Sequence, residues 1–195
     1  YLRQSFCDVG TYWIREFDID GWRLDVANEL DDGFLRAFRA AVKAAKQDAL
    51  IVGEVWENAA DKIAYGKRRS YFRGAQLDSV MNYPTRKALL DYAEFGDASA
   101  LAAALTDLYS SYPRPVSASL MNLIGTHDTE RVLTILGNPI KVRENSYAYN
   151  AVQEQLRLTA EERARGTQLL CMISALQFTL FGFPCVYYGD EAGME

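Results

Sequence analysis

The chain has 195 residues, of which 49% are hydrophobic, 12% aromatic and 24% charged. This composition supports a hydrophobic core and excludes an intrinsically disordered chain. Acidic residues outnumber basic ones by 26 to 21, for a net charge of −5, so the chain has no excess of lysine and arginine with which to neutralise phosphates, and we expect no nucleic-acid partner.

Cysteine content and hydropathy exclude two further classes. The three cysteines are far apart and form no CxxC pair, so neither a disulfide scaffold nor a zinc site is expected. Residues 166–189 carry no charge and are long enough to cross a bilayer. They contain Gln168, Gln177 and a Gly-Phe-Pro breaker at 182–184, which favours a buried helix followed by a buried strand. We therefore expect no membrane partner.

Short apolar runs alternate with longer helical patterns along the chain. In chain order, the pattern predicts a helix over 1–15, a strand over 21–26, a helix from Asp31 to about residue 46, strands over 49–56 and 75–83, helical material over 84–112, a strand that ends near 126–128, a loop over 138–158, a helix that begins near Thr159 and a strand over 185–189. The longest basic run, at 67–69, is expected to be a solvated loop. The repeated alternation of helix and strand indicates an α/β fold with a parallel sheet. A barrel and an open doubly wound sheet are equally consistent with it.

Three acidic residues, Asp25, Glu54 and Asp128, each lie at the polar end of an apolar run. Because the carboxyl ends of parallel strands meet at one edge of a sheet, we expect these side chains to converge there. Asp25 and Glu54 are 29 residues apart, about the length of one βα repeat. Any one of them alone is more often a helix cap or a solvated loop carboxylate, but the repeated position favours a site.

The surroundings of two of these acids predict different roles. Arg23 and Asp25 are two residues apart on one strand and share a face. An arginine there keeps the carboxylate ionised, as a nucleophile requires, although a structural ion pair is an alternative. Glu54 has largely apolar neighbours in the sequence, Val52, Val55 and Trp56. Such surroundings favour a proton donor, and two carboxylates in contrasting environments are what glycoside hydrolysis requires.

His127 is the only histidine. A lone histidine is usually structural, and the chain has no second one to complete a metal site. The polar neighbours Thr126 and Asp128 favour substrate binding here. The sequence contains no GxSxG, P-loop or GxGxxG pattern, which removes the simplest serine-hydrolase and nucleotide-binding hypotheses.

Four stretches together resemble glycoside hydrolase family 13, the α-amylase family. They are residues 21–29 (GWRLDVANE), 53–56 (GEVW), 125–128 (GTHD) and 184–191 (PCVYYGDE), which are similar, in order, to the family's motifs at strands 4, 5, 7 and 8. The resemblance implies the α/β class and a partial TIM (β/α)8 barrel composed of strands 4 to 8 with their helices. We expect residues 1–195 to form a single partial catalytic-barrel domain that is truncated at both ends.

The resemblance also implies a role for each candidate. Asp25 corresponds to the nucleophile and Glu54 to the general acid/base. Asp128 would stabilise the transition state by holding sugar hydroxyls, with Arg23 and His127 as supporting substrate-binding residues. The implied enzyme is a retaining hydrolase of α-1,4 glucosidic bonds, with α-1,6 bonds as a further candidate and an α-glucan as its partner.

Asn28 and Glu29 stand where typical α-amylases have Lys-His. With residues 78–84 (DSVMNYP), this wording is similar to that of neopullulanases, cyclomaltodextrinases and maltogenic amylases, and it implies that Asn28 and Glu29 bind the sugar on the leaving-group side. The absent histidine is a calcium ligand in classical α-amylases. We therefore expect no cofactor and no metal site in this segment, while calcium remains a candidate for the full-length enzyme.

Other functions stay open within and beyond this chemistry. The three acids do not distinguish hydrolysis from transglycosylation or glucoside isomerisation, and a non-catalytic relative that binds a partner is a further alternative. The family's strand-3 motif is absent, and a partial barrel leaves strand edges and apolar surface uncovered. We therefore expect the segment by itself to form a homo-oligomer and to have little activity. The odd cysteine count slightly favours a cytoplasmic location.

Overall fold

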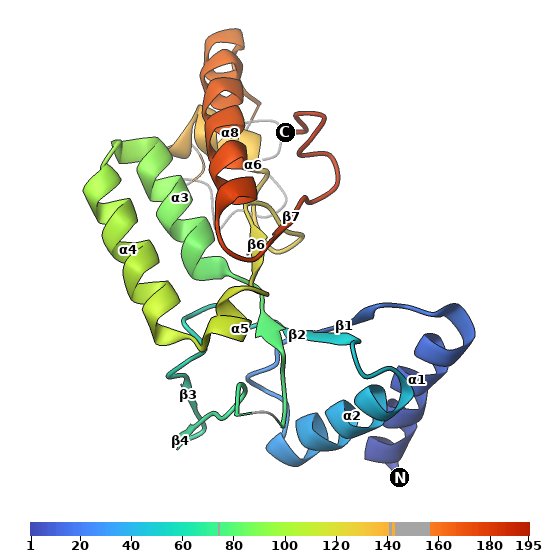
Figure 1. Ribbon diagram of the computed structural model, residues 1–195. Helices are drawn as coiled ribbons and strands as arrows, with labels where there is room; N and C mark the ends of the chain where they lie inside the picture. Colours follow the sequence, from blue (N-terminus) through green and yellow to red (C-terminus); the bar gives the residue numbers. More distant parts are fainter. Residues whose placement is uncertain (74, 141, 143–156) are drawn as a thin grey trace. The chain divides into compact units, whose positions relative to one another are not determined.

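The structure is a computed structural model that describes residues 1–73, 75–140, 142 and 157–195 (Figure 1). It comprises two compact units, one formed by Tyr1–Pro84 with Leu108–Met121 and the other by Thr85–Asp107 with Asn122–Glu195. Each unit has its own cluster of buried hydrophobic residues. Most of the loop predicted over 138–158, namely residue 141 and residues 143–156, lies outside the described residues.

The first unit contains a parallel three-stranded sheet in the order β1-β2-β5. Its strands are β1 (Gly21–Leu24), β2 (Leu50–Gly53) and β5 (Ser79–Val80). Both pairings are parallel, which confirms the predicted parallel α/β arrangement. The strand predicted over 75–83 is wrong for most of its length, because residues 75–76 lie in a turn or bend and a helix already begins at Tyr83.

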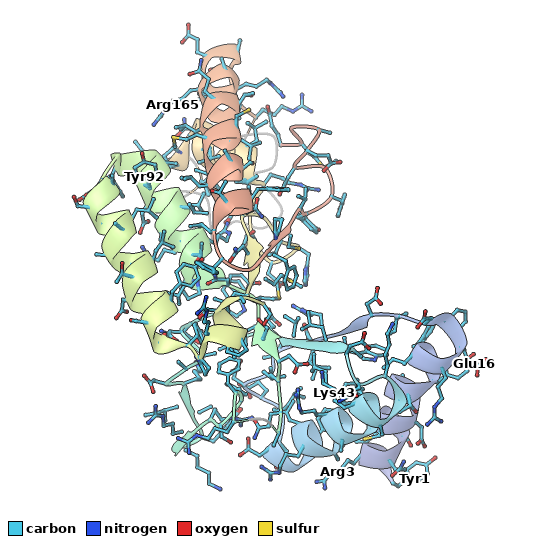
Figure 2. All side chains as sticks on the ribbon, in the orientation of Figure 1. Tyr1, Arg3, Glu16, Lys43, Tyr92 and Arg165 are labelled. Carbon is cyan, nitrogen blue, oxygen red and sulfur yellow. The ribbon has the colours of Figure 1, made fainter. Side chains whose placement is uncertain are left out.

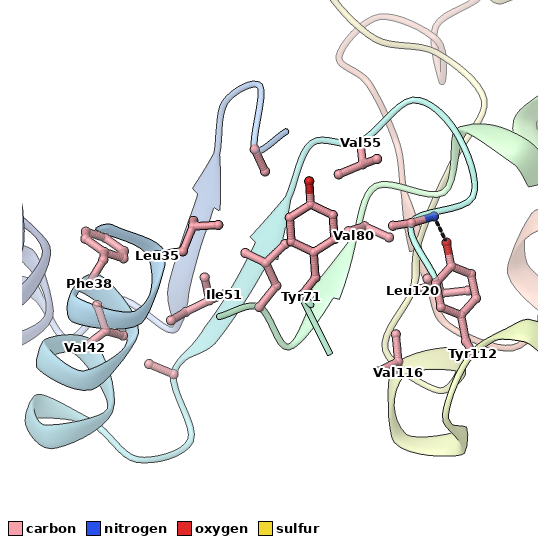
Figure 3. Packing of buried hydrophobic residues seen from close by; sticks show 14 of the residues in the cluster. Leu35, Phe38, Val42, Ile51, Val55, Tyr71, Val80, Tyr112, Val116 and Leu120 are labelled. Atoms are coloured by element: carbon pink, nitrogen blue, oxygen red, sulfur yellow. Dashed lines mark hydrogen bonds between the residues drawn. The ribbon is translucent and has the colours of Figure 1, made fainter. Parts of the chain in front are cut away.

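Two helices accompany this sheet, α1 (Leu2–Phe17) and α2 (Asp32–Ala45), and they lie side by side (Figure 1). The predicted start of α2 is confirmed, because Asp31 Oδ1 accepts a hydrogen bond from Phe34 N at 3.0 Å as an N-cap. Figure 3 shows residues of α2, Leu35 and Phe38 among them, packing with Ile51 of β2. α2 is the crossover helix between the parallel strands β1 and β2. This apolar contact packs it against the sheet.

A second part of the same core lies near α5 (Arg114–Ser117). The Tyr112 hydroxyl accepts a hydrogen bond from Ala59 N at 2.7 Å (Figure 3). Burial raises the pKa of Tyr112 to about 12, so this hydroxyl stays protonated at neutral pH. The contact ties the segment after β2 to residues about 50 positions further along the chain.

An antiparallel pair that the sequence pattern did not predict, β3 (Ile63–Ala64) and β4 (Lys67–Arg68), is joined by Tyr65 and Gly66. Both linking residues have positive φ, 54° and 71°, as a two-residue hairpin turn of type I′ requires. The Tyr-Gly pair between short runs was the available signal. Lys67 and Arg68 are exposed, as expected for this basic run.

Arg69, the last residue of that run, is buried, so the prediction of a solvated loop is wrong at this position. Its Nη2 donates a hydrogen bond to Leu30 O at 2.6 Å and forms an ion pair with Asp32 at 3.3 Å. The guanidinium carbon also lies 5.2 Å from the centroid of the Tyr71 ring. Burial is tolerated because these partners meet the charge.

The second unit is mainly helical. It includes most of α3 (Tyr83–Phe95) and α4 (Ala98–Ser111), together with α6 (Val132–Gly137) and α8 (Ala160–Thr179). The helical material predicted over 84–112 is thus two helices separated at Gly96, which has a φ of 71°. β6 (Met121–Leu123) and β7 (Phe183–Cys185) form a two-stranded sheet. The last strand therefore ends at Cys185, where the prediction had placed its start.

The start of α8 is as predicted. Thr159 and Glu162 form a reciprocal capping box, with distances of 3.2 and 2.8 Å. Only Gly166, Ile173 and Gln177 of this helix are buried, so the expectation of a buried helix is wrong for most of its surface, and Arg165 projects outward (Figure 2). No helix in the described part of the chain is both long and apolar enough to cross a membrane.

Asp78, the residue before β5, forms a polar cluster with groups of α2 and β2. Its carboxylate pairs with Arg39 at 2.7 Å and Lys43 at 2.9 Å and accepts a hydrogen bond from Ile51 N at 2.9 Å. Lys43 belongs to α2 (Figure 2). Burial alone would raise the pKa of Asp78, but the bonds from Lys43, Arg39 and Ile51 outweigh it and lower the pKa.

We expect Asp78→Asn to lower the free energy of unfolding by about 3 kcal/mol at pH 7, because it leaves two partly buried cations without their carboxylate. Since the folded pKa is lowered, this stabilisation is present above the unfolded pKa of about 3.9 and is lost as pH falls through the folded pKa. Denaturant unfolding at pH 7 and in acid measures both effects. The matched change at the exposed pair of Asp91 and Lys87, Asp91→Asn, should cost less than about 1 kcal/mol. An equal cost for the two variants would contradict the prediction.

Candidate active site

Asp25 and Glu54 leave adjacent strands at the same level. In the parallel register of β1 and β2, Leu24 is the partner of Gly53, and each acid is the next residue in its strand's chain direction. Glu54 N donates a hydrogen bond to Leu24 O, and Ala27 N donates one to Glu54 O, both at 2.9 Å. The prediction that these two acids follow neighbouring parallel strands at their carboxyl ends is confirmed, and the 29-residue spacing is the length of this βα unit.

One guanidinium bridges the two acids. Arg23 Nη1 lies 2.5 Å from Asp25 Oδ1, and Arg23 Nη2 lies 3.0 Å from Glu54 Oε2. Arg23 Nε also donates to the sulfur of Met81 at 3.4 Å. The predicted shared face of Arg23 and Asp25 is therefore confirmed. The arginine holds both carboxylates within reach of one planar group.

The two acids differ sharply in exposure, 72% for the Asp25 side chain and 4% for that of Glu54. The surroundings of Glu54 are more polar than its sequence neighbours suggest. Its Oε1 accepts a hydrogen bond from Trp56 Nε1 at 3.0 Å, and its Oε2 accepts one from Val26 N at 2.8 Å. The contrast in environment is present, but Glu54 is held by donors from three sides, counting Arg23, and is not in an apolar pocket.

The backbone at Val26 is strained. This β-branched residue has a φ of 39°, in the left-handed region that such residues rarely adopt, at a cost of about 1–3 kcal/mol. The turn directs its N–H group at Glu54 Oε2. Strain thus occurs between the two acids, at the point where the chain leaves β1 and contacts the next strand end.

Asn28 and Glu29 lie in the turn after Asp25. Asn28 Nδ2 donates a hydrogen bond to Glu29 Oε1 at 3.0 Å. Glu29 is exposed and Asn28 is half-buried. Both therefore belong to the first unit, in the segment that follows the candidate nucleophile.

His127 and Asp128 belong to the second unit. β6 ends at Leu123, earlier than predicted, and Asp128 lies in a turn in which its N–H donates to Thr126 Oγ1 at 3.2 Å. His127 Nε2 lies 3.2 Å from Asp128 Oδ2. The structure thus brings Arg23, Asp25 and Glu54 together in one unit and His127 and Asp128 together in the other, and convergence of all three acids stays a prediction.

Trp56 contacts Glu54 in a way that the sequence did not predict. Its indole N–H contacts Glu54, and its ring stacks on Tyr83, with centroids 4.1 Å apart and planes 12° from parallel. The available signal was the two-residue spacing from Glu54, which places both on one face of an extended chain.

Among the described residues, no three His, Cys, Asp or Glu side chains gather as metal ligands would.

We expect Trp56→Phe to lower the free energy of unfolding by about 1.5–3 kcal/mol, because it removes a hydrogen bond to a charged group while a ring can still stack on Tyr83. Denaturant unfolding measures the change. Trp13→Phe, the same substitution at an exposed tryptophan of α1, is the control and should change the free energy of unfolding by no more than about 0.5 kcal/mol. An equal cost for both variants would show that the N–H group contributes nothing to stability.

The chain resembles a known protein family over most of its length. Residues 1–160 match the α-amylase catalytic domain. The chain is 42% identical over 195 residues to a cyclomaltodextrinase of Geobacillus thermopakistaniensis and 36% identical over 196 residues to neopullulanase 2 of Thermoactinomyces vulgaris; each match covers 99% of this chain and 27% of the relative. The chain thus spans about a quarter of the length of these relatives.

Solved structures give the same result. The cyclic α-maltosyl-(1→6)-maltose hydrolase of Arthrobacter globiformis superimposes with a TM-score of 0.75 at 36% identity, over 98% of this chain and 36% of that one. The type III pullulan hydrolase of Thermococcus kodakarensis gives 0.73 at 34% identity, over 97% and 29%. An α/β barrel segment is consistent with these neighbours. The chain belongs to the α-amylase catalytic-domain family of glycoside hydrolases.

Proposed function

We propose that the chain forms strands 4 to 8, with their helices, of the catalytic barrel of a retaining α-glucan hydrolase. In this assignment β1, β2, β5, β6 and β7 are the five strands in order. The observation that carries the proposal is the bridge from Arg23 to Asp25 and Glu54 at the carboxyl ends of two adjacent parallel strands. Active sites of (β/α)8 enzymes occupy that edge, and one exposed and one buried acid suit two different roles.

The proposed reaction has two steps. The carboxylate of Asp25 attacks the anomeric carbon of the sugar while the bond to the leaving oxygen breaks and Glu54 gives its proton to that oxygen. A water molecule then attacks the anomeric carbon, Glu54 takes up the water's proton, and the bond to Asp25 breaks. Arg23 contacts both acids and holds their carboxylates in orientation. Asp128, with His127 beside it, would hold sugar hydroxyls.

The proposed substrates are α-1,4 glucans and, as a further class, α-1,6-linked glucans. The relatives named for cyclomaltodextrin, maltogenic and pullulan hydrolysis support this class of substrate. Asn28 and Glu29 follow the nucleophile in the same turn, which suits contact with the sugar on the leaving-group side.

Product analysis tests the proposal on the full-length protein that contains this chain. Incubation with maltotriose, cyclodextrin and pullulan should release reducing sugar whose anomeric configuration is initially α by NMR. Release of the β anomer would contradict a retaining mechanism, and no release from any α-glucan would contradict hydrolysis. Products longer than the substrate would instead show transglycosylation. A changed linkage without release of reducing sugar would show isomerisation.

We also propose that the chain by itself associates with a second copy and has little activity. Two observations support association. β1 pairs on one side only among the described residues, with β2, and α1 exposes several large apolar side chains, namely Leu2, Phe6, Tyr12, Trp13 and Phe17. Light scattering of the isolated chain should give a mass of a dimer or more, and a stable monomer would contradict this.

A further inference from the structure

The turn that carries His127 and Asp128 is bordered by a charged pair that the proposed chemistry does not use. Arg131 is the residue immediately before α6, and Asp190 follows β7. Arg131 Nη1 lies 3.4 Å from Asp190 Oδ1, and their side chains are 17% and 4% exposed. A covered ion pair is weak evidence for a contribution to stability, so the further contacts of this pair are what indicate its role.

Arg131 holds the segment after β7 by more than this ion pair. Its Nη1 donates a hydrogen bond to Tyr188 O at 2.6 Å. The guanidinium carbon lies 4.9 Å from the ring centroid of Tyr187 and 4.7 Å from that of Tyr188. One planar cation therefore contacts a carboxylate, a carbonyl and two ring faces, a set of contacts that lysine cannot reproduce.

Asp190 contacts the other end of the turn, at Gly125. A Cβ atom at residue 125 would lie 2.1 Å from Asp190 Oδ2, so glycine is required here by close approach. Asp190 Oδ2 is buried and has no hydrogen-bond partner among the residues that the structure describes. A buried carboxylate oxygen without a partner lowers the stability of the fold. A contribution to stability therefore does not explain why Asp190 is placed here. Asp190 thus contacts both ends of residues 125–131, Gly125 by close approach and Arg131 by the ion pair.

We propose that Asp190 and Arg131 are positioning residues, which together hold the 125–131 turn and thereby the carboxylate of Asp128 in the orientation that the substrate requires. The proposal rests on the proposed function, in which Asp128 holds sugar hydroxyls. Neither residue needs to touch the substrate. The internal hydrogen bonds of the turn, such as that from Asp128 N to Thr126 Oγ1, set its local shape. The Arg131–Asp190 pair holds the turn against the segment that follows β7.

The arrangement has a consequence for pH. Burial raises the pKa of Asp190, against the opposing charges of Arg131 and Arg86, and with a smaller contribution in the same direction from Glu191. Tyr187 and Tyr188 also face Arg131. Protonation removes the charge that Arg131 binds, so the anchoring contact weakens as pH falls through the raised pKa of Asp190.

The test uses Asp190→Asn and Arg131→Lys in the full-length protein. Each should lower kcat on an α-glucan about ten- to hundredfold, the effect of a small displacement of a catalytic group, with a much smaller change in KM. Because asparagine does not titrate, the acid limb of the pH profile should move to lower pH in Asp190→Asn. Glu191→Gln removes an exposed carboxylate one residue away; it should leave kcat unchanged and move the acid limb far less than Asp190→Asn does, because Glu191 makes only a smaller contribution to the pKa of Asp190.

Gly125→Ala tests the contact from its other side. The added methyl group displaces the Asp190 carboxyl, so it should reproduce the loss of kcat. Wild-type kcat in folded Asp190→Asn and Arg131→Lys variants, or an acid limb that does not move in Asp190→Asn, would overturn the proposal. Asp128→Asn separates it from the proposed function: if this variant is inactive while the pair variants retain kcat, only the positioning role fails, whereas an active Asp128→Asn variant contradicts the role of Asp128 itself.

Discussion

In the full-length protein that contains this chain, Asp25→Asn should lower kcat on α-glucans by about 10⁴-fold or more, as expected for loss of the proposed nucleophile. The amide keeps the size of the side chain but does not attack the anomeric carbon. Because the Asp25 side chain is 72% exposed, the substitution should change the free energy of unfolding by no more than about 1 kcal/mol. Kinetics and thermal unfolding of the same preparation separate lost chemistry from lost folding.

A direct test of the same role is trapping of the covalent intermediate. A fluorosugar substrate that slows the second step should leave one fluorinated glycosyl group on the peptide that contains Asp25, as detected by mass spectrometry. Asp20→Asn is the matched control, since Asp20 is an exposed aspartate in the segment before β1, and it should keep normal kcat. Labelling of another residue, or more than a tenth of wild-type kcat in Asp25→Asn, would exclude Asp25 as the nucleophile.

Glu54→Gln should lower kcat about 10²–10⁴-fold on natural glucans, the usual contribution of general acid–base catalysis. Glutamine cannot give a proton to the leaving oxygen. A substrate whose leaving group needs no proton, such as α-glucosyl fluoride, should lose much less rate in the first step.

Glu57→Gln provides the control for this second prediction, because Glu57 is an exposed glutamate three residues away that pairs with Lys62. It should behave as the wild type with every substrate. Loss of Glu54 also removes a partner of Arg23 and of the Trp56 N–H group, so melting temperatures of both variants are compared. An equal loss of rate on glucans and on the fluoride would contradict a proton-donor role.

Much of the first unit was predictable, and the reason is local. The helical apolar spacing with acidic residues at its start predicted α2, and the continuous apolar run predicted β2. Short-range patterns fail to predict burial where contacts between distant residues determine it. Arg69 belongs to a basic run, yet it is buried, because it donates a hydrogen bond to Leu30 O and forms an ion pair with Asp32. Likewise, the buried polar side chain of α8, Gln177, donates to Asn122 O and Cys185 O, bonds that no periodicity indicates.

The candidate site divides in the same way. The sequence by itself determines that Asp25 and Glu54 end successive strands, because a 29-residue βα repeat brings equivalent positions of parallel strands to one sheet edge. Only the tertiary structure decides what surrounds them: the Arg23 bridge, the Trp56 N–H group on Glu54 and the strained Val26. In the second unit it decides that Arg131 pairs with Asp190 across 59 positions. These contacts depend on distances and angles between segments far apart in the chain, and such geometry is set by packing rather than by the order of residues.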